Sequence, residues 1–256
     1  MIAPDDRGLT LGDGLFETLL AVDGQLRDVE AHLDRMVAGC ATLGLPPPER
    51  GVALKAMTDA LDAQDGRGGR WAVRLTLTAG WGGRGLDRPA QPGTRLFASA
   101  APAPAPAGPA VLVTSRIRRN EASPTSRLKT LSYLDNVLAR AEARAAGADE
   151  ALMVNTHGEV ACAAAATVFW LSRAVLHTPP LDCGVLAGTA RARLIRAASG
   201  LGVPVVETAA GLQTLAGAQA VLITNSLIGL RAVEGLDGRR FPGHDLVRVL
   251  AEAMAA

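Results

Sequence analysis

The chain has 256 residues, 48% of them hydrophobic and 20% charged, which is the composition of an ordinary globular protein with one or two domains. Its formal net charge is +1 and no basic cluster alternates with aromatic residues, so the sequence argues against nucleic acid as a partner. No apolar run reaches the roughly 20 residues that a membrane helix needs, and the acidic N-terminus is unlike a signal peptide, so we expect no membrane partner.

The three cysteines, Cys40, Cys162 and Cys183, are odd in number and widely spaced. This spacing argues against a disulfide framework and against a metal site. It is typical of a protein kept in a reducing compartment, so we expect a cytoplasmic location.

The first distinctive stretch is DRGLTLGDGLFETLL, which begins at Asp6. Its glycines, Gly8, Gly12 and Gly14, predict a loop that needs open backbone angles. Residues 15–22 then read as a strand, and the Asp-Gly pair that follows is a hairpin signal.

Residues 30–45 carry apolar side chains at helical spacing and predict an amphipathic helix. His32 and Arg35 lie three positions apart and so share one face of that helix. On the local pattern alone, Arg35 fits a surface ion pair. A second helix is predicted over 49–63, followed by strands over 71–78 and 96–100. Arg74, in the first of these strands, fits either an approach to an acidic substrate or a solvated strand face.

Residues 101–109 alternate proline with alanine, ending in Gly-Pro. Such a stretch favours extended polyproline geometry and cannot join a helix or an inner strand. It therefore predicts a domain boundary, with one α/β lobe over 1–107 and a second over 108–256.

The run RLKTLSYLDN, residues 127–136, places Lys129 between two leucines just before a helix that is predicted to begin near Ser132. Partial removal from water disfavours the ammonium form, lowers the lysine pKa and leaves an amine that can attack a carbonyl. A surface lysine whose stem covers apolar neighbours fits the same local pattern.

The second half of the chain reads as short strands over 110–115, 150–155, 159–161 and 167–171. His157 falls in the turn between two of them, which favours a solvated histidine. A helix over 189–201 places Gly188 and Thr189 at a helix N-terminus, where either a phosphate site or a plain cap would fit. Thr224, Asn225 and Ser226 follow a strand over 220–223 and, on pattern alone, form an ordinary turn.

These stretches together resemble the class IV aminotransferases, from Asp6 to about Val233. The similarity lies in RLKTLSYLDNVLARAEARAAGADEAL, VNTHGEV, DRGLTLGDGLFET, TPPLDCGVLAGTAR and TNSL-x-G. The FET and TNSL-x-G strings are closest to the aminodeoxychorismate lyases of that family. The resemblance implies the two-lobe α/β architecture of fold type IV enzymes, with pyridoxal 5'-phosphate (PLP) between the lobes.

The resemblance also implies roles for individual residues. Lys129 would attach PLP covalently and then act as general base and acid. Tyr133 would contact the ring oxygen of the cofactor, although simple packing explains it equally well. The remaining residues would hold the phosphate: Arg35, Gly188, Thr189, Ala190, Asn225 and Ser226.

One position departs from the family pattern. The family motif G-x-V-x-E places a glutamate on the pyridine nitrogen, and here Cys162 occupies that position while Thr167 replaces an asparagine. Glu159 lies three positions earlier, so along a strand it would point to the opposite face. A neutral thiol cannot stabilise a pyridinium as a carboxylate does. The departure is therefore easier to reconcile with an elimination than with a transamination.

The expected activity, implied by the resemblance, is cleavage of 4-amino-4-deoxychorismate to p-aminobenzoate and pyruvate on the route to folate. A class IV aminotransferase acting on branched-chain or D-amino acids is the main alternative. A non-catalytic protein with the same fold is a third. Members of this family are commonly homodimers, so we expect one here.

Overall fold

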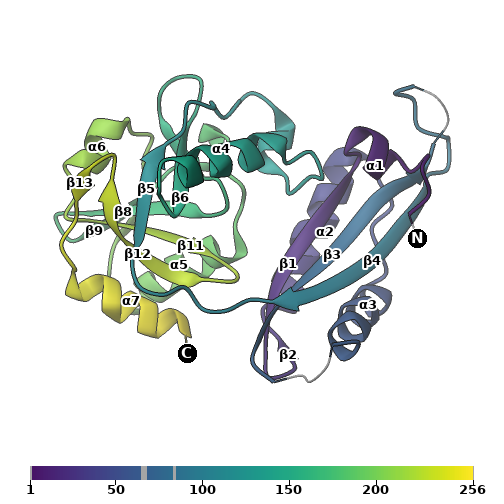
Figure 1. Ribbon diagram of the computed structural model, residues 1–256, viewed down its shortest axis with the longest axis horizontal. Coiled ribbons are helices and arrows are strands. Elements are labelled where there is room, and N and C mark those ends of the chain that lie inside the picture. The colour runs from purple at the N-terminus through teal and green to yellow at the C-terminus, as the bar shows by residue number, and fades with distance from the viewer. Residues whose placement is uncertain (1, 65–67, 83–84, 256) are drawn as a thin grey trace. The chain divides into compact units, whose positions relative to one another are not determined.

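The computed structural model describes residues 2–64, 68–82 and 85–255, which form two compact units (Figure 1). The first unit runs to Ala105 and also contains Leu128–Tyr133; the second contains Pro106–Arg127 and continues from Leu134. The sequence-based division places Lys129 in the second lobe, whereas its contacts place it in the first unit. Backbone pairing explains the difference, because chain order alone does not show which strand a distant segment joins.

The first unit contains, among its described residues, a four-stranded antiparallel sheet in the order β2-β1-β3-β4. Its strands are β1 (Gly14–Val22), β2 (Gln25–Leu26), β3 (Arg70–Trp81) and β4 (Gly93–Pro102), and its helices are α1 (Arg7–Leu11), α2 (Val29–Leu43) and α3 (Arg50–Asp62). The predicted strands and the two longer predicted helices are confirmed. The hairpin turn is also confirmed, because Asp23 and Gly24 both have positive φ.

The predicted loop around Gly8 is wrong, because one helical turn, α1, occupies this position. Asp6 caps it by accepting a hydrogen bond from the Gly8 nitrogen at 2.8 Å, and Gly12 ends it with a φ of 67°. The predicted linker also begins too early, since β4 continues through Pro102. A proline is tolerated there because β4 is an edge strand.

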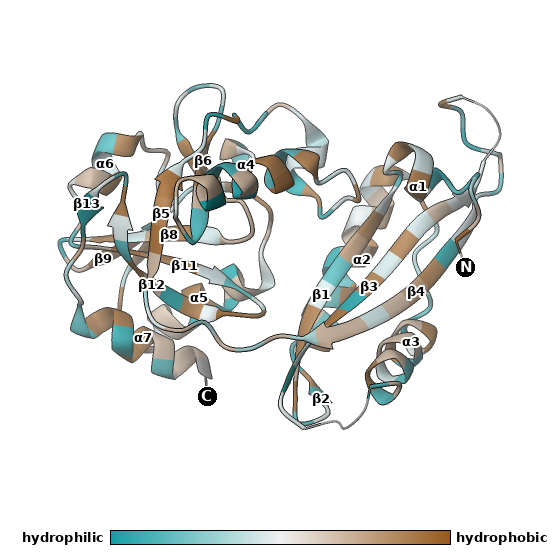
Figure 2. Cartoon of the chain, in the orientation of Figure 1, coloured by the Kyte–Doolittle hydropathy of each residue, from teal (hydrophilic) through white to brown (hydrophobic). Residues whose placement is uncertain are grey.

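One face of this sheet packs against α2 and α3 (Figure 2). Alternate residues of β1, including Leu15 and Leu19, point to the helices and are fully or nearly fully buried. Glu17 lies between them on the same face. The opposite face carries Phe16 and Thr18.

The second unit contains, over the part that the structure describes, a nine-stranded sheet in the order β10-β9-β8-β11-β12-β5-β6-β7, with β13 beside β12. The strands are β5 (Ala110–Thr114), β6 (Glu150–Val154), β7 (Val160–Ala163), β8 (Thr167–Ser172), β9 (Val175–Thr178), β10 (Val205–Glu207), β11 (Ala220–Asn225), β12 (Gly229–Leu236) and β13 (Arg239–Arg240). The helices are α4 (Leu134–Ala145), α5 (Thr189–Gly200), α6 (Leu212–Ala216) and α7 (Asp245–Ala255) with two short 3-10 turns, η1 (Pro124–Arg127) and η2 (Leu181–Cys183).

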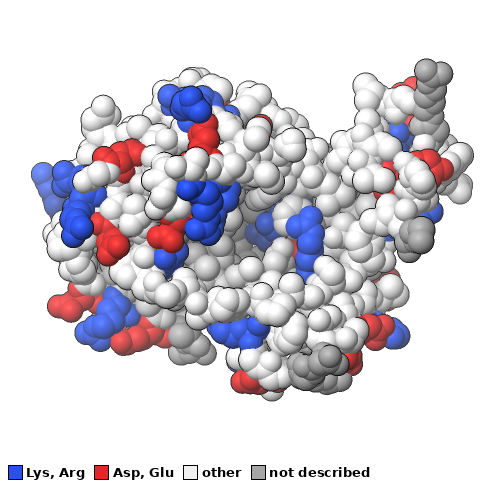
Figure 3. Space-filling view, in the orientation of Figure 1, with Lys and Arg blue, Asp and Glu red and all other residues white. Residues whose placement is uncertain are grey.

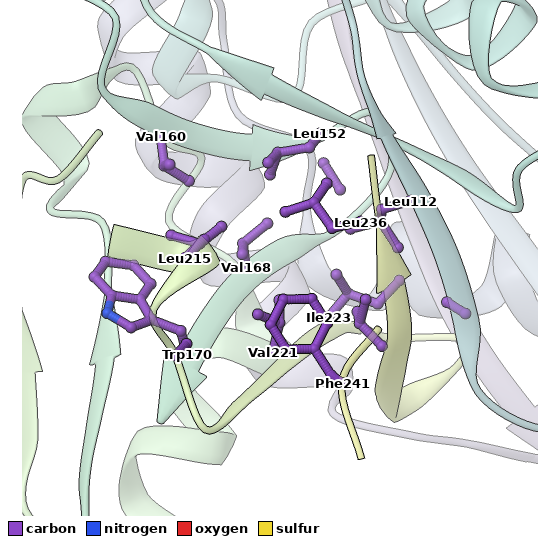
Figure 4. Packing of buried hydrophobic residues seen from close by; sticks show 14 of the residues in the cluster. Leu112, Leu152, Val160, Val168, Trp170, Leu215, Val221, Ile223, Leu236 and Phe241 are labelled. Carbon is purple, nitrogen blue, oxygen red and sulfur yellow. The ribbon is translucent and has the colours of Figure 1, made fainter. Parts of the chain in front are cut away.

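The largest core of the second unit lies on one face of this sheet (Figure 4). Trp170 of β8 is 1% exposed and packs with Val221 and Ile223 of β11 and with Leu215 of α6. Helices α5 and α7 cover a second apolar cluster, and α4 covers a third against β6 and β7. These three apolar clusters hold β7, β11 and α5 in place, and these elements carry Cys162, Asn225 and Thr189.

Positive and negative side chains lie interspersed on the face shown in Figure 3, in keeping with the balanced net charge. No described helix is long and apolar enough to cross a membrane. Within residues 2–64, 68–82 and 85–255, no group of His, Cys, Asp and Glu side chains could hold a metal ion.

Candidate active site

Lys129 belongs to a short segment that pairs with β1 in the first unit. The Phe16 nitrogen donates to the Lys129 carbonyl at 2.9 Å, and the Leu131 nitrogen donates to the Gly14 carbonyl at 3.0 Å. Leu128 packs into the core under the sheet. The helix that follows begins at Leu134, two residues after the predicted start. Lys129 is therefore held by a sheet edge and a core contact and not by a helix.

Two aromatic rings flank the Lys129 amine. Its Nζ lies 4.2 Å from the centre of the Phe16 ring and 5.2 Å from that of Tyr133. The two rings meet edge to face, with centres 5.2 Å apart and planes at 84°. Tyr133 thus packs at the lysine, which is consistent with both of the roles expected for it.

The pKa of Lys129 is lowered to about 8, first by burial and then by the positive charge of Arg35. Glu17 opposes this shift, and Arg74 adds to it. At pH 7 roughly a tenth of the Lys129 side chain is therefore free amine, the form that attacks a carbonyl, against well under one part in a thousand at the ordinary pKa of 10.5. An ordinary surface lysine whose stem covers apolar neighbours, the alternative that the sequence allowed, would keep its charged end in water and would not have this lowered pKa.

Arg35 binds a buried carboxylate that sequence reasoning did not identify. Its Nε donates to one oxygen of Glu17 at 2.8 Å and an Nη donates to the other at 2.5 Å, while His32 Nδ1 lies 2.6 Å from that second oxygen. Burial opposes ionisation of Glu17, but the hydrogen bonds from Arg35 and His32 outweigh it and lower the Glu17 pKa. A charged residue between Leu15 and Leu19 in an otherwise apolar strand face is the sequence signal for this pair.

The second unit brings two of the predicted phosphate motifs together. Thr189 begins α5, and its Oγ1 lies 3.1 Å from Oγ of Ser226, which follows β11. Gly188 occupies the N-cap of α5, and a Cβ there would lie 3.2 Å from Thr167 Oγ1. Ala190 is buried in the first turn. Two hydroxyls and a helix N-terminus approached through a glycine are the features of a phosphate cradle.

Asn225 organises the turn after β11. Its Oδ1 accepts hydrogen bonds from the nitrogens of Leu227 and Ile228 at 2.9 Å each, and its Nδ2 donates to the Ala165 carbonyl at 2.8 Å. These contacts explain the residue as a turn former. They fix the backbone that positions Ser226, its neighbour.

Cys162 lies in β7 and is 7% exposed, within a cluster of alanines against α4. Burial raises the pKa of its thiol, with Arg119 lowering it and Glu150 raising it further. The thiol is therefore neutral at pH 7. Glu159 does not take its place, because its carboxylate accepts from Asn155 Nδ2 at 2.8 Å and from Cys183 Sγ at 3.5 Å.

Arg119 is a buried cation that sequence reasoning missed. It donates to Asn136 Oδ1 and to the carbonyls of Gly184 and Ser126. It thereby joins the start of α4 to two loops of the second unit. His157, by contrast, lies in an exposed turn as predicted, 3.5 Å from Glu121.

Each unit by itself holds residues that fit one part of PLP, which offers an aldehyde and a phosphate. The amine of Lys129, with a pKa of about 8, suits the aldehyde. The Thr189–Ser226 hydroxyl pair and the N-terminus of α5 suit the phosphate.

The family model described as amino-transferase class IV matches residues 14–236. The chain belongs to this family. Family membership makes it a PLP-dependent enzyme, so the non-catalytic alternative is not retained. Similarity to solved structures places it in fold type IV, which confirms the expected fold class.

The similar proteins within the family are named for the two activities that the sequence analysis considered, aminodeoxychorismate cleavage and amino-group transfer. A Methanocaldococcus jannaschii protein provisionally named branched-chain-amino-acid aminotransferase is 31% identical, over 91% of this chain and 82% of its own. The bifunctional aminodeoxychorismate lyase / D-amino acid transaminase of Mycobacterium tuberculosis is 28% identical, over 100% of this chain and 93% of its own length. The solved structure of the 4-amino-4-deoxychorismate lyase of Pseudomonas aeruginosa is 34% identical in sequence. The match covers 98% of this chain and 93% of the lyase chain, with a TM-score of 0.88.

Proposed function

We propose that this enzyme is a PLP-dependent lyase that converts 4-amino-4-deoxychorismate to p-aminobenzoate and pyruvate. The likeness to the Pseudomonas aeruginosa lyase and the FET and TNSL-x-G strings support this choice. The observation that carries it is the buried, neutral thiol of Cys162 at the position where the family pattern has a carboxylate.

When bound, PLP supplies an electron-withdrawing ring that stabilises negative charge on the substrate carbon next to its amine. Lys129 would hold the cofactor through its free amine. Its pKa of about 8 then suits it to accept a proton from that carbon and to return one. Phe16 and Tyr133 limit the water that reaches the Lys129 amine.

The phosphate is assigned to residues that offer donors. Arg35 is positioned by Glu17 and offers a guanidinium, which suits a phosphate because of its planar fork. The backbone at Gly188, Thr189 and Ala190 and the Ser226 hydroxyl form the other donors, with Asn225 holding the turn. Tyr133 is assigned to the ring oxygen of PLP.

Elimination tolerates a weak electron sink better than transamination does. A transaminase needs a long-lived delocalised carbanion, because a proton must move to the cofactor and back. In the lyase reaction the bond from the ring carbon to the enolpyruvyl oxygen breaks as the proton leaves, and formation of an aromatic ring drives the step. A neutral Cys162 is compatible with that shorter-lived charge.

Amino-group transfer is the second candidate function. The 31% identity to the Methanocaldococcus jannaschii protein favours a branched-chain amino acid as substrate, and the likeness to the bifunctional Mycobacterium tuberculosis protein favours a D-amino acid. Exchange of an amino group with a keto acid would distinguish this activity from the lyase reaction.

We also propose a homodimer. Helix α4 exposes an apolar stripe at Leu134, Val137 and Leu138, which are 65%, 59% and 51% exposed. A partner copy would cover such a stripe. Light scattering of the purified protein measures the mass directly, and a mass of one chain would contradict the proposal.

The lyase is tested by p-aminobenzoate release from enzymatically generated aminodeoxychorismate with added PLP, comparing wild type with Lys129→Ala. We expect product from the wild type and none from the variant. A folded, PLP-loaded wild type that releases no product would overturn the lyase assignment.

A further inference from the structure

Thr167 is the first residue of β8, and its hydroxyl is buried without a hydrogen-bond partner. The residue is 7% exposed. Among the residues that the structure describes, no group bonds to its Oγ1, whereas the buried threonines of the two neighbouring strands are paired. Thr178 Oγ1 donates to the Val168 carbonyl at 2.9 Å, and Thr224 Oγ1 donates to the Gly229 carbonyl at 2.6 Å. A buried hydroxyl that lacks a partner costs free energy, so a ligand that supplies one gains affinity there.

The Thr167 side chain lies beside the N-terminus of α5. Phe169 and Leu171 of β8 pack into the apolar cluster under α5, and Thr167, at the same alternation along the strand, belongs to that face. It stands opposite Thr224 of β11, at the strand end that leads to Ser226. A Cβ on Gly188, the N-cap of α5, would lie 3.2 Å from Thr167 Oγ1. The absent Cβ leaves room between this hydroxyl and the first turn of the helix.

Two further hydroxyls and a buried cation lie at the same helix end. Thr189 Oγ1, on the first residue of α5, is 3.1 Å from Ser226 Oγ. Arg191, also in the first turn, has its Nε buried and without a hydrogen-bond partner in the part of the chain that the structure describes. Its Nη2 lies 3.0 Å from a Glu207 oxygen, but the Glu207 side chain is 48% exposed, so water screens that pair. The helix dipole and the guanidinium both favour an anion here.

We propose that the Thr167 hydroxyl donates to the cofactor phosphate, as a third hydroxyl beside those of Thr189 and Ser226, and so helps to select the phosphorylated cofactor. This inference rests on the proposed function, because it takes the N-terminus of α5 as the phosphate site. Thr167 stands where the family pattern has an asparagine, and both side chains are neutral donors. The two departures from the motif thus differ in kind, because Cys162 removes a carboxylate whereas Thr167 keeps a donor.

The experiment titrates the PLP-free protein with PLP and with pyridoxal, which lacks only the phosphate, by calorimetry. Thr167→Val removes the hydroxyl and keeps the shape of the side chain, and Thr167→Ser keeps the hydroxyl. The matched control is Thr178→Val on the neighbouring strand β9, which also removes a buried hydroxyl, but one that already has a partner in the Val168 carbonyl. Thermal unfolding of each PLP-free variant and the 31P resonance of bound PLP are measured in parallel.

We expect Thr167→Val to weaken PLP binding about ten-fold, as the loss of a hydrogen bond to a charged group does, and to leave pyridoxal affinity within about two-fold of wild type. Thr167→Ser should keep most of the PLP affinity, and Thr178→Val should keep all of it. The stability effects should run the other way. Thr178→Val should unfold at a lower temperature than wild type, whereas Thr167→Val should not, because its hydroxyl bonds to nothing in the PLP-free protein.

The 31P resonance of bound PLP should shift in Thr167→Val and stay at the wild-type position in Thr178→Val. A Thr167→Val variant with wild-type PLP affinity would overturn the proposal, and so would one that loses PLP and pyridoxal affinity equally. A wild type that binds pyridoxal as tightly as PLP would refute the phosphate site itself, and this inference with it. The titrations need no turnover, so a protein that shows the expected selection but releases no p-aminobenzoate would support the inference and refute only the lyase assignment.

Discussion

Glu17 and Arg35 form a two-point ion pair that joins strand β1 to helix α2, with Nε to Oε1 at 2.8 Å and Nη2 to Oε2 at 2.5 Å. Glu17 is 1% exposed, and Arg35 is 15% exposed. The two residues have opposite effects on the pKa of Lys129, because the charge of Arg35 lowers it and the charge of Glu17 raises it. One buried carboxylate thus orients a candidate phosphate ligand and also adjusts the charge of the candidate catalytic amine.

Glu17→Gln should destabilise the protein and weaken PLP binding. The substitution takes from Arg35 and His32 the buried anion that both contact, and breaking such a pair costs about 3–5 kcal/mol. PLP affinity should fall at least about ten-fold. Urea unfolding and PLP titration measure the two effects. The control is Asp59→Asn, which breaks an exposed ion pair with Lys55 and should cost under about 1 kcal/mol. Equal effects of the two variants would contradict the role given to Glu17.

Lys129→Met should stabilise the PLP-free protein below pH 8. The folded pKa of about 8 lies below the unfolded value of 10.5, so between these values the unfolded chain binds more protons and wild-type stability rises with pH. Below pH 8 the partly buried ammonium costs up to about 3 kcal/mol. The advantage of the variant should therefore shrink as the pH rises from 8 to 10.5.

Thermal unfolding over this pH range tests the Lys129 prediction. Lys55→Met is the control, because Lys55 is 74% exposed. Its difference from wild type should not follow the same pH course. A difference between wild type and Lys129→Met that stays constant from pH 7 to 10.5 would show that the Lys129 pKa is not lowered.

Gly188→Ala should weaken PLP binding without unfolding the protein. The backbone φ at Gly188 is −70°, which alanine adopts readily, but its Cβ would lie 3.2 Å from Thr167 Oγ1 and from Arg191 Cβ. The added methyl group also narrows the approach to the N-terminus of α5. We expect about a ten-fold loss of PLP affinity.

Gly211→Ala is the matched control for Gly188→Ala, since Gly211 is the N-cap of α6 and a Cβ there meets its nearest neighbour only at 3.5 Å. PLP titration of both variants measures the effect. Unchanged affinity in Gly188→Ala would remove the α5 N-terminus from the cofactor site.

The helices that periodicity predicted were found close to their expected bounds, because their apolar stripes coincide with the buried faces of α2, α3 and α5. Pairing between distant segments was not predictable in the same way. Nothing in the local pattern at Lys129 shows that its carbonyl accepts a hydrogen bond from Phe16.

Charged residues within apolar patterns were the sites most easily missed. Glu17 occupies a core-facing position in β1, and its role can be recognised only with Arg35, its ion-pair partner 18 residues later. The side chain of Arg119 donates hydrogen bonds to three residues, of which Gly184 is 65 positions away in the sequence. Such pairs follow from tertiary packing, so the resemblance to a family located Arg35 but not the carboxylate that holds it.

Cys162→Glu should add amino-transfer activity that the wild type lacks. A carboxylate at this position would stabilise a protonated pyridine nitrogen, and the charge of Arg119, which favours the anionic form at residue 162, would help to keep it ionised. The alanine cluster around it disfavours a buried charge, so we expect a lower unfolding temperature. Cys162→Ala is the control and should keep the wild-type reaction. Amino transfer that is no greater in the glutamate variant than in the alanine variant would contradict this account of Cys162.

The most direct test measures both products of the wild-type enzyme in one reaction that contains aminodeoxychorismate, a D-amino acid and a keto acid. We predict that p-aminobenzoate and pyruvate form in equal amounts and far exceed any new amino acid. Efficient amino exchange with no p-aminobenzoate would contradict the lyase assignment and identify the enzyme as an aminotransferase.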